Sequence, residues 1–87
     1  MEKCFKLYFS EEKQKFHLDD SSFFEKSGYI LIFEEITTIE FIAYMYFIKR
    51  VNPIKYSKKY IRITSEGFRI FLKNLKNENI KLVKNKK

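Results

Sequence analysis

A nearly continuous apolar stretch, residues 29–48, sets the strongest limit on how this chain can fold. The stretch is about long enough to cross a bilayer, but it contains Glu34, Glu35 and Glu40. Each charge in the middle of a membrane costs on the order of 3 kcal/mol. The stretch therefore predicts the core of a small water-soluble domain, and we expect no membrane partner.

Local signals divide this stretch into two elements. Residues 29–33 are aromatic and β-branched and follow a glycine directly, which favours a buried strand. Thr37 and Glu40 have the spacing of a capping box, in which each side chain binds the backbone N–H of the other residue. They predict a helix over residues 38–50 that ends before Pro53. This helix is apolar on nearly every side, so either the core or a partner must cover it.

The N-terminal segment shows the period of a β-hairpin. Two runs alternate between apolar and polar residues and are separated by a polar turn at residues 10–14. One face of the predicted hairpin carries Phe5, Leu7, Phe9, Phe16 and Leu18. After the hairpin, residues 19–22 are typical helix caps, and Gly28 can close a helix of at most two turns.

The C-terminal half predicts one more strand and one more helix. Residues 59–63 alternate aromatic, β-branched and basic side chains and are read as a strand. Thr64 or Ser65 then caps a helix over residues 65–77, whose predicted core face is Phe68, Phe71, Leu72 and Leu75. Residues 80–83 suggest an edge strand, and residues 84–87 form a basic tail.

These elements predict a single α+β domain over residues 1–87. No linker-like stretch divides the chain, and ten Phe and six Tyr supply a dense core. The predicted sheet is antiparallel and joins the hairpin to strands near 29–33 and 59–63. Helices 38–50 and 65–77 pack against it.

Charge is distributed unevenly along the chain. Residues 1–48 contain nine acidic and five basic residues, whereas residues 49–87 contain two acidic and thirteen basic ones. The halves therefore carry net charges of −4 and +11, which together give the formal charge of +7. Such a basic half attracts phosphate backbones or acidic proteins, although a lysine-rich surface also keeps an aromatic domain soluble.

Residues for catalysis are scarce. The chain has one histidine, His17, and one cysteine, Cys4, so neither a zinc site nor an intramolecular disulfide is expected. Acidic residues at positions 19, 20, 34 and 35 are more typical of helix caps and solvated ends than of a Mg²⁺ site. We therefore expect a non-catalytic cytoplasmic protein without a metal or another cofactor.

The segment from Tyr60 to Leu72, YIRITSEGFRIFL, resembles the end of the wing in winged-helix DNA-binding domains. There a strand leads through Thr, polar residues and Gly into a C-terminal helix. The resemblance covers about a third of the chain if it is extended back to Thr37. It implies a winged-helix fold as the alternative, with wing residues at Lys58, Lys59, Tyr60 and Arg62 near the phosphate backbone. The helix over 38–50 would take the place of the recognition helix, yet its residues Phe41, Tyr44, Met45 and Tyr46 are not the Arg, Asn or Gln side chains expected to read bases.

Two functions remain in competition. The first is nucleic-acid binding through the basic half, and the second is a phage- or mobile-element-type inhibitor or adaptor that docks on a nucleic-acid-processing machine. Expected residues for the nucleic acid or an acidic partner are Lys55, Lys58, Lys59, Tyr60, Arg62, Arg69, Lys73 and Lys76. Expected aromatic contacts for a protein partner are Tyr44, Tyr46 and Tyr56.

The sequence also predicts how three of the expected binding residues are oriented. Arg69, Lys73 and Lys76 recur at i, i+4 and i+7, so they share one side of the final helix and should point outward. They would lose this freedom if Glu34 and Glu35 folded across them. The oligomeric state stays open, a homodimer included.

Overall fold

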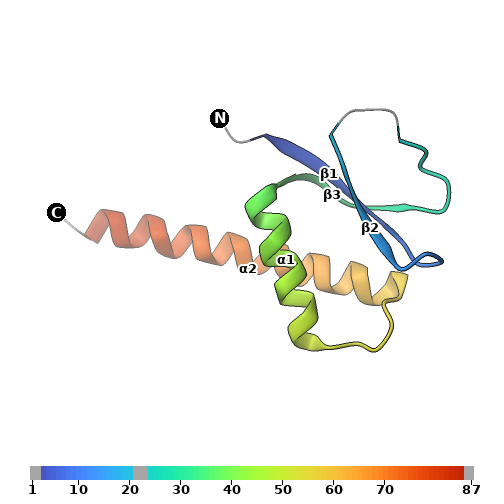
Figure 1. Cartoon of the computed structure of the whole chain (residues 1–87). Coiled ribbons are helices and arrows are strands. Elements are labelled where there is room, and N and C mark those ends of the chain that lie inside the picture. Colours follow the sequence, from blue (N-terminus) through green and yellow to red (C-terminus); the bar gives the residue numbers. More distant parts are fainter. Residues whose placement is uncertain (1–2, 21–23, 86–87) are drawn as a thin grey trace.

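A three-stranded antiparallel sheet and two helices make up the fold, which confirms the α+β class (Figure 1). The computed structural model describes residues 3–20 and 24–85, with side chains as far as residue 77. The elements are β1 (Cys4–Ser10), β2 (Lys15–Asp19), β3 (Ile30–Thr37), α1 (Thr38–Val51) and α2 (Lys58–Asn85). The strand order is β2-β1-β3, so the predicted hairpin forms one side of the sheet and β3 the other.

The sheet buries both faces of its central strand. Leu7 and Phe9 of β1 point toward the helices, whereas Tyr8 points to the opposite face, as alternation along a strand requires. On that opposite face the Phe24 ring lies 5.3 Å from Tyr8 and stacks on His17 at 3.7 Å. Residues 24–28 therefore form a covering loop instead of the predicted short helix, while residues 21–23 lie outside the described residues.

α1 begins where the capping box predicts. The Glu40 amide donates to Thr37 Oγ1 at 3.2 Å, and the Thr37 amide donates to Glu40 Oε1 at 3.0 Å. Asn52 ends the helix in the left-handed region, with φ of 51°, and its N–H donates to Lys49 O. The predicted helix over 38–50 is thus confirmed to within one residue.

Tyr44 of α1 is the centre of the core. Its fully buried ring contacts Phe16 of β2, Phe33 of β3 and Phe68 of α2, with ring centroids 5.1 to 6.4 Å apart. Its hydroxyl lies 3.2 Å from Thr64 Oγ1 and donates to Ile61 O at 3.4 Å. Burial raises the pKa of Tyr44 to about 12, because the interior disfavours the phenolate. One tyrosine therefore joins both hairpin and helices into one core.

The strand predicted over residues 59–63 is wrong, because these residues form the first turns of α2. The Ser57 hydroxyl accepts a hydrogen bond from the Tyr60 amide at 3.2 Å, and the Ser57 carbonyl accepts one from Ile61 at 2.9 Å. Ile61 and Phe68, seven residues apart, are both buried against the sheet. Helical spacing of core residues thus overrides the local strand preference.

α2 is also longer than predicted at its C-terminal end. Residues 80–83, read as an edge strand, continue the helix, as do the first two residues of the predicted basic tail. Figure 1 shows α2 extending well past α1 and the sheet. The Cα radius of gyration is 14.9 Å, compared with about 12 Å for a compact domain of this length. The backbone of α2 therefore extends the molecule along one direction.

A single side chain joins the hairpin turn to the connection between the helices. Gln14 adopts φ of 53°, and its amide nitrogen donates to Glu11 O and Tyr56 O at 2.7 Å each. Its amide oxygen accepts from the Tyr56 N–H at 2.9 Å. The hairpin therefore fixes the point at which the chain enters α2.

Candidate nucleic-acid interface

α2 brings five of the predicted binding residues onto one side of one helix. An α-helix advances about 100° per residue, so residues 4, 7, 11, 15 and 18 positions apart return to nearly the same side. The extension of α2 back to residue 58 therefore aligns residues that the sequence had placed on a strand with those on a helix. We call this set the basic stripe: Lys58, Arg62, Arg69, Lys73 and Lys76.

The basic stripe runs for about 27 Å along α2, at 1.5 Å per residue. All five side chains are exposed. Among the described side chains, Lys6 and Glu34 form an ion pair at 3.6 Å, and no ion pair involves the basic stripe. No described acidic side chain therefore neutralises the stripe through an ion pair.

Arg69 does not point freely outward, contrary to the expectation from helix spacing. Its guanidinium donates a hydrogen bond to the carbonyl oxygen of Ile32 on β3. The same group lies over the Phe33 ring, 4.8 Å from the ring centroid. Arg69 therefore fastens α2 to the outer edge of the sheet while its side chain remains solvent-accessible.

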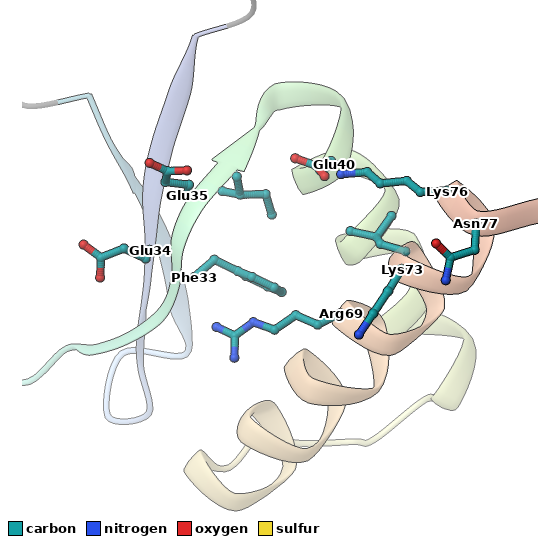
Figure 2. A pocket seen from close by; sticks show the side chains of 10 residues that line it. Phe33, Glu34, Glu35, Glu40, Arg69, Lys73, Lys76 and Asn77 are labelled. Atoms are coloured by element: carbon teal, nitrogen blue, oxygen red, sulfur yellow. The ribbon is translucent and has the colours of Figure 1, made fainter. Parts of the chain in front are cut away.

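A pocket of about 640 Å³ opens between β3 and α2 beside Arg69 (Figure 2). Its floor is apolar and contains Phe33, Ile36 and Leu72, while Arg69, Lys73, Lys76 and Asn77 form the α2 wall. The lining also includes three glutamates, two of which have other partners. Glu34 pairs with Lys6 and points away from α2 in Figure 2, and Glu40 belongs to the capping box.

The sequence left open whether Glu34 and Glu35 fold across the basic stripe; in the structure they lie near it. Both line the same pocket as Lys73 and Lys76, but no ion pair joins them among the described side chains. Glu40 keeps its place in the capping box and also lies near Lys76 in Figure 2. The acidic half therefore borders the stripe without covering it.

Two of the remaining predicted basic residues lie beside the stripe. Lys55 is in the connection before α2, and Lys59 lies about a quarter turn from Lys58. Both are exposed. They add positive charge next to Lys58, at the N-terminal end of the helix.

The predicted aromatic residues serve mainly in packing. Tyr44 is fully buried, so its assignment as a protein contact is wrong. The Tyr60 hydroxyl donates to Ile48 O at 2.9 Å, and burial together with the neighbouring Tyr56 raises the pKa of Tyr60. Tyr56 packs edge-on against Phe9 and Phe16. Neither Tyr56 nor Tyr60 therefore presents a free ring beside the basic residues.

One apolar side of α1 is uncovered. The sequence of this helix is apolar on nearly every side, so part of its apolar surface stays exposed when no partner covers it. Ile39, Ile42 and Tyr46 recur at helical spacing and are 68, 62 and 68 % exposed. Lys49 and Arg50 follow at the end of this exposed face. Ile54, in the connection to α2, is fully exposed, and no pattern in the sequence indicated it.

The one cysteine and the one histidine of the chain lie apart. Cys4 pairs with Thr37 at one end of β1, whereas His17 pairs with Tyr8, four residues along the strand, and stacks on Phe24. At about 3.3 Å per residue they are separated by more than 10 Å. Among the described residues no three His, Cys, Asp or Glu side chains are grouped to hold a metal ion.

The segment that resembles a winged helix, residues 60–72, lies wholly within α2. Within the described ranges, neither helix has the length and apolarity needed to span a membrane. Comparison with known proteins found no matching family model, no similar curated protein and no similar solved structure.

Proposed function

We propose that this protein binds nucleic acid, without catalysing a reaction, through the basic stripe of α2. The observation that carries the proposal is the alignment of five exposed cations on one side of a continuous helix. A helix that projects from its domain can approach a polyanion along its length. The cations then face successive phosphates, and the release of condensed counterions supplies the binding free energy.

The salt dependence of binding tests this proposal quantitatively. If Lys58, Arg62, Lys73 and Lys76 contact phosphates of a duplex while Arg69 stays bound to β3, the logarithm of the association constant should fall with the logarithm of salt concentration at a slope of about −3.6. Each neutralised contact should make the slope shallower by about 0.9. Fluorescence anisotropy with a labelled duplex over a salt series measures both quantities.

The variants for this experiment are Lys58→Gln and Arg62→Gln, and the matched control is Lys15→Gln on β2. Lys15 is also exposed but belongs to the hairpin and not to the basic stripe. The stripe variants should weaken binding and flatten the slope, whereas the control should match the unmodified protein. Equal effects from Lys15 and the stripe residues would mean that total charge, and not the stripe, governs binding. Absence of binding at low salt would refute the proposal.

The exposed side of α1 supports a second candidate, an inhibitor or adaptor that docks on a protein. Its partner would present apolar side chains to Ile39, Ile42 and Tyr46 and carboxylates to Lys49 and Arg50. Such contacts place the affinity in a few buried apolar anchors. The candidate predicts a nuclease-resistant complex that is lost in Tyr46→Asp and retained in Arg62→Gln. The reverse pattern would favour the basic stripe.

A further inference from the structure

We infer that the pocket between β3 and α2 holds an unpaired base of a single-stranded nucleic acid, with the adjoining phosphate on Lys73. This inference rests on the proposed nucleic-acid function and specifies which form of nucleic acid the stripe selects. Three features of the pocket carry it: its volume and apolar floor, a flat cation beside that floor, and Lys73 on its wall.

The pocket has the size and lining of a site for a small planar group. Its volume of about 640 Å³ falls within the roughly 300–1,000 Å³ typical of ligand pockets. Its apolar floor is formed by Phe33, Ile36 and Leu72, and because Phe33 and Ile36 are almost fully buried, Leu72 and the Arg69 guanidinium offer the surface open to the face of a base. Cations lie only along one wall. The site therefore suits a ligand that is apolar at one end and anionic at the other.

Arg69 provides a preformed stacking platform at this site. Its guanidinium is held over the Phe33 ring and fixed by the hydrogen bond to Ile32 O. Unstacked bases in single strands are commonly received on Arg guanidinium planes and aromatic rings. Because the group is already oriented, little side-chain entropy is lost when a base stacks on it.

Three glutamates, Glu34, Glu35 and Glu40, and three cations, Arg69, Lys73 and Lys76, line the pocket, and Lys73 is the cation at which an anion can bind. Glu34 is engaged by Lys6, and Glu40 by the amide of Thr37, and neither engages Lys73. Lys73 lies one helical turn beyond Arg69 on the same wall and has no ion pair among the described side chains. A phosphate attached to the stacked nucleotide can therefore reach Lys73 while the base occupies the floor.

This arrangement distinguishes single strands from duplexes. In a duplex every base is paired and stacked, and extruding one costs a few kcal/mol. The basic stripe alone binds either form, because it contacts only phosphates. The pocket adds affinity only when the base is already unpaired.

The test compares fluorescently labelled single-stranded oligonucleotides with abasic versions of the same length, measured by anisotropy. The two probes carry the same phosphates, so the stripe contributes equally to both. We expect the base-bearing strand to bind at least about fivefold more tightly, the lower end of what stacking of one base contributes. Equal affinities would overturn the pocket inference and leave the stripe proposal standing. Binding of neither probe would overturn both.

A charge-conserving variant places the effect at the pocket. Arg69→Lys keeps the cation but loses the planar group, whereas the control Arg62→Lys makes the same change at a stripe residue remote from the pocket. The first should reduce base-bearing affinity to the abasic level with an unchanged salt slope, and the second should change neither. Urea titration confirms that both variants are folded. An Arg69→Lys variant that still prefers the base-bearing strand would refute the platform.

Discussion

Replacing Arg69 with methionine should destabilise the domain although Arg69 is exposed. The change removes the hydrogen bond from a charged group to Ile32 O, worth about 1.5–3 kcal/mol, and the contact of the cation with Phe33, worth about 0.5–1 kcal/mol at exposed sites. Solvent screens both, so we take the lower ends and expect a loss of about 2 kcal/mol. The methionine side chain keeps much of the apolar packing over Phe33, so the loss reports the polar contacts.

Arg62→Met is the matched control for this prediction. Arg62 lies on the same stripe and is exposed, and among the described residues its side chain makes no hydrogen bond or ion pair; exposed substitutions of this kind change stability by about 0.5 kcal/mol or less. Urea unfolding followed by circular dichroism gives both values. For a slope of about 1–2 kcal/mol per molar urea, the Arg69 variant should unfold about 1–2 M earlier than the control. Equal midpoints for the two variants would refute the role of Arg69 in fastening α2 to β3.

Three further substitutions test the core and the backbone. Tyr44→Phe should cost about 1 kcal/mol at neutral pH, because it removes the hydroxyl that bonds to Thr64 Oγ1 and Ile61 O, while Thr64 still donates to backbone carbonyls. Because burial raises the Tyr44 pKa from its ordinary 10.0 to about 12, the unfolded chain loses its proton first. Stability should therefore fall by about 1.4 kcal/mol per pH unit between these values, and this contribution should vanish in Tyr44→Phe unfolding curves measured across that range. Gly67→Ala should raise the melting temperature by relieving an entropic cost of about 0.5–1 kcal/mol, since an added Cβ inside α2 meets no atom within 4 Å. Gly28→Ala should lower the free energy of unfolding by about 1–2 kcal/mol, and with it the melting temperature, because φ at Gly28 is +79°. Shifts of the same sign in these two variants would contradict the backbone assignment.

The first half of the fold could be predicted because its signals are local. Alternation defines the hairpin, and Thr37 and Glu40 make the two hydrogen bonds that the capping box implies. β3 is longer than the predicted strand and includes Glu34 and Glu35, whose charges concealed it. Those charges are tolerated because both side chains are exposed at the edge of the sheet.

The start of α2 could not be predicted because its residues favour other structures in isolation. Thr64 and Ser65 are typical caps, yet both are buried inside the helix and donate to carbonyls one turn earlier, which satisfies their hydroxyls locally. The burial of Ile61 against the sheet then decides in favour of the helix. A usable signal was Ser57, whose side chain caps the first turn.

The candidate site was predictable in its residue types and not in its geometry. The excess of cations in the C-terminal half is visible from the sequence, and the basic stripe draws all five members from residues expected to bind. The contact of Arg69 with β3 and the pocket beside it depend on a pairing of segments 37 residues apart. No pattern of neighbouring residues in the sequence predicts such a contact.

Gln14 has a consequence for which sequences the connection between the helices can accept. Its amide donates to the carbonyl of Tyr56 and accepts from the N–H of the same residue. These are the two bonds that a residue exchanges with its opposite neighbour in a hydrogen-bonded pair of antiparallel strands. A side chain here acts as a one-residue strand and binds only the main chain at position 56. The direction in which the chain enters α2 is therefore set by bonds that every residue except proline can make at that position.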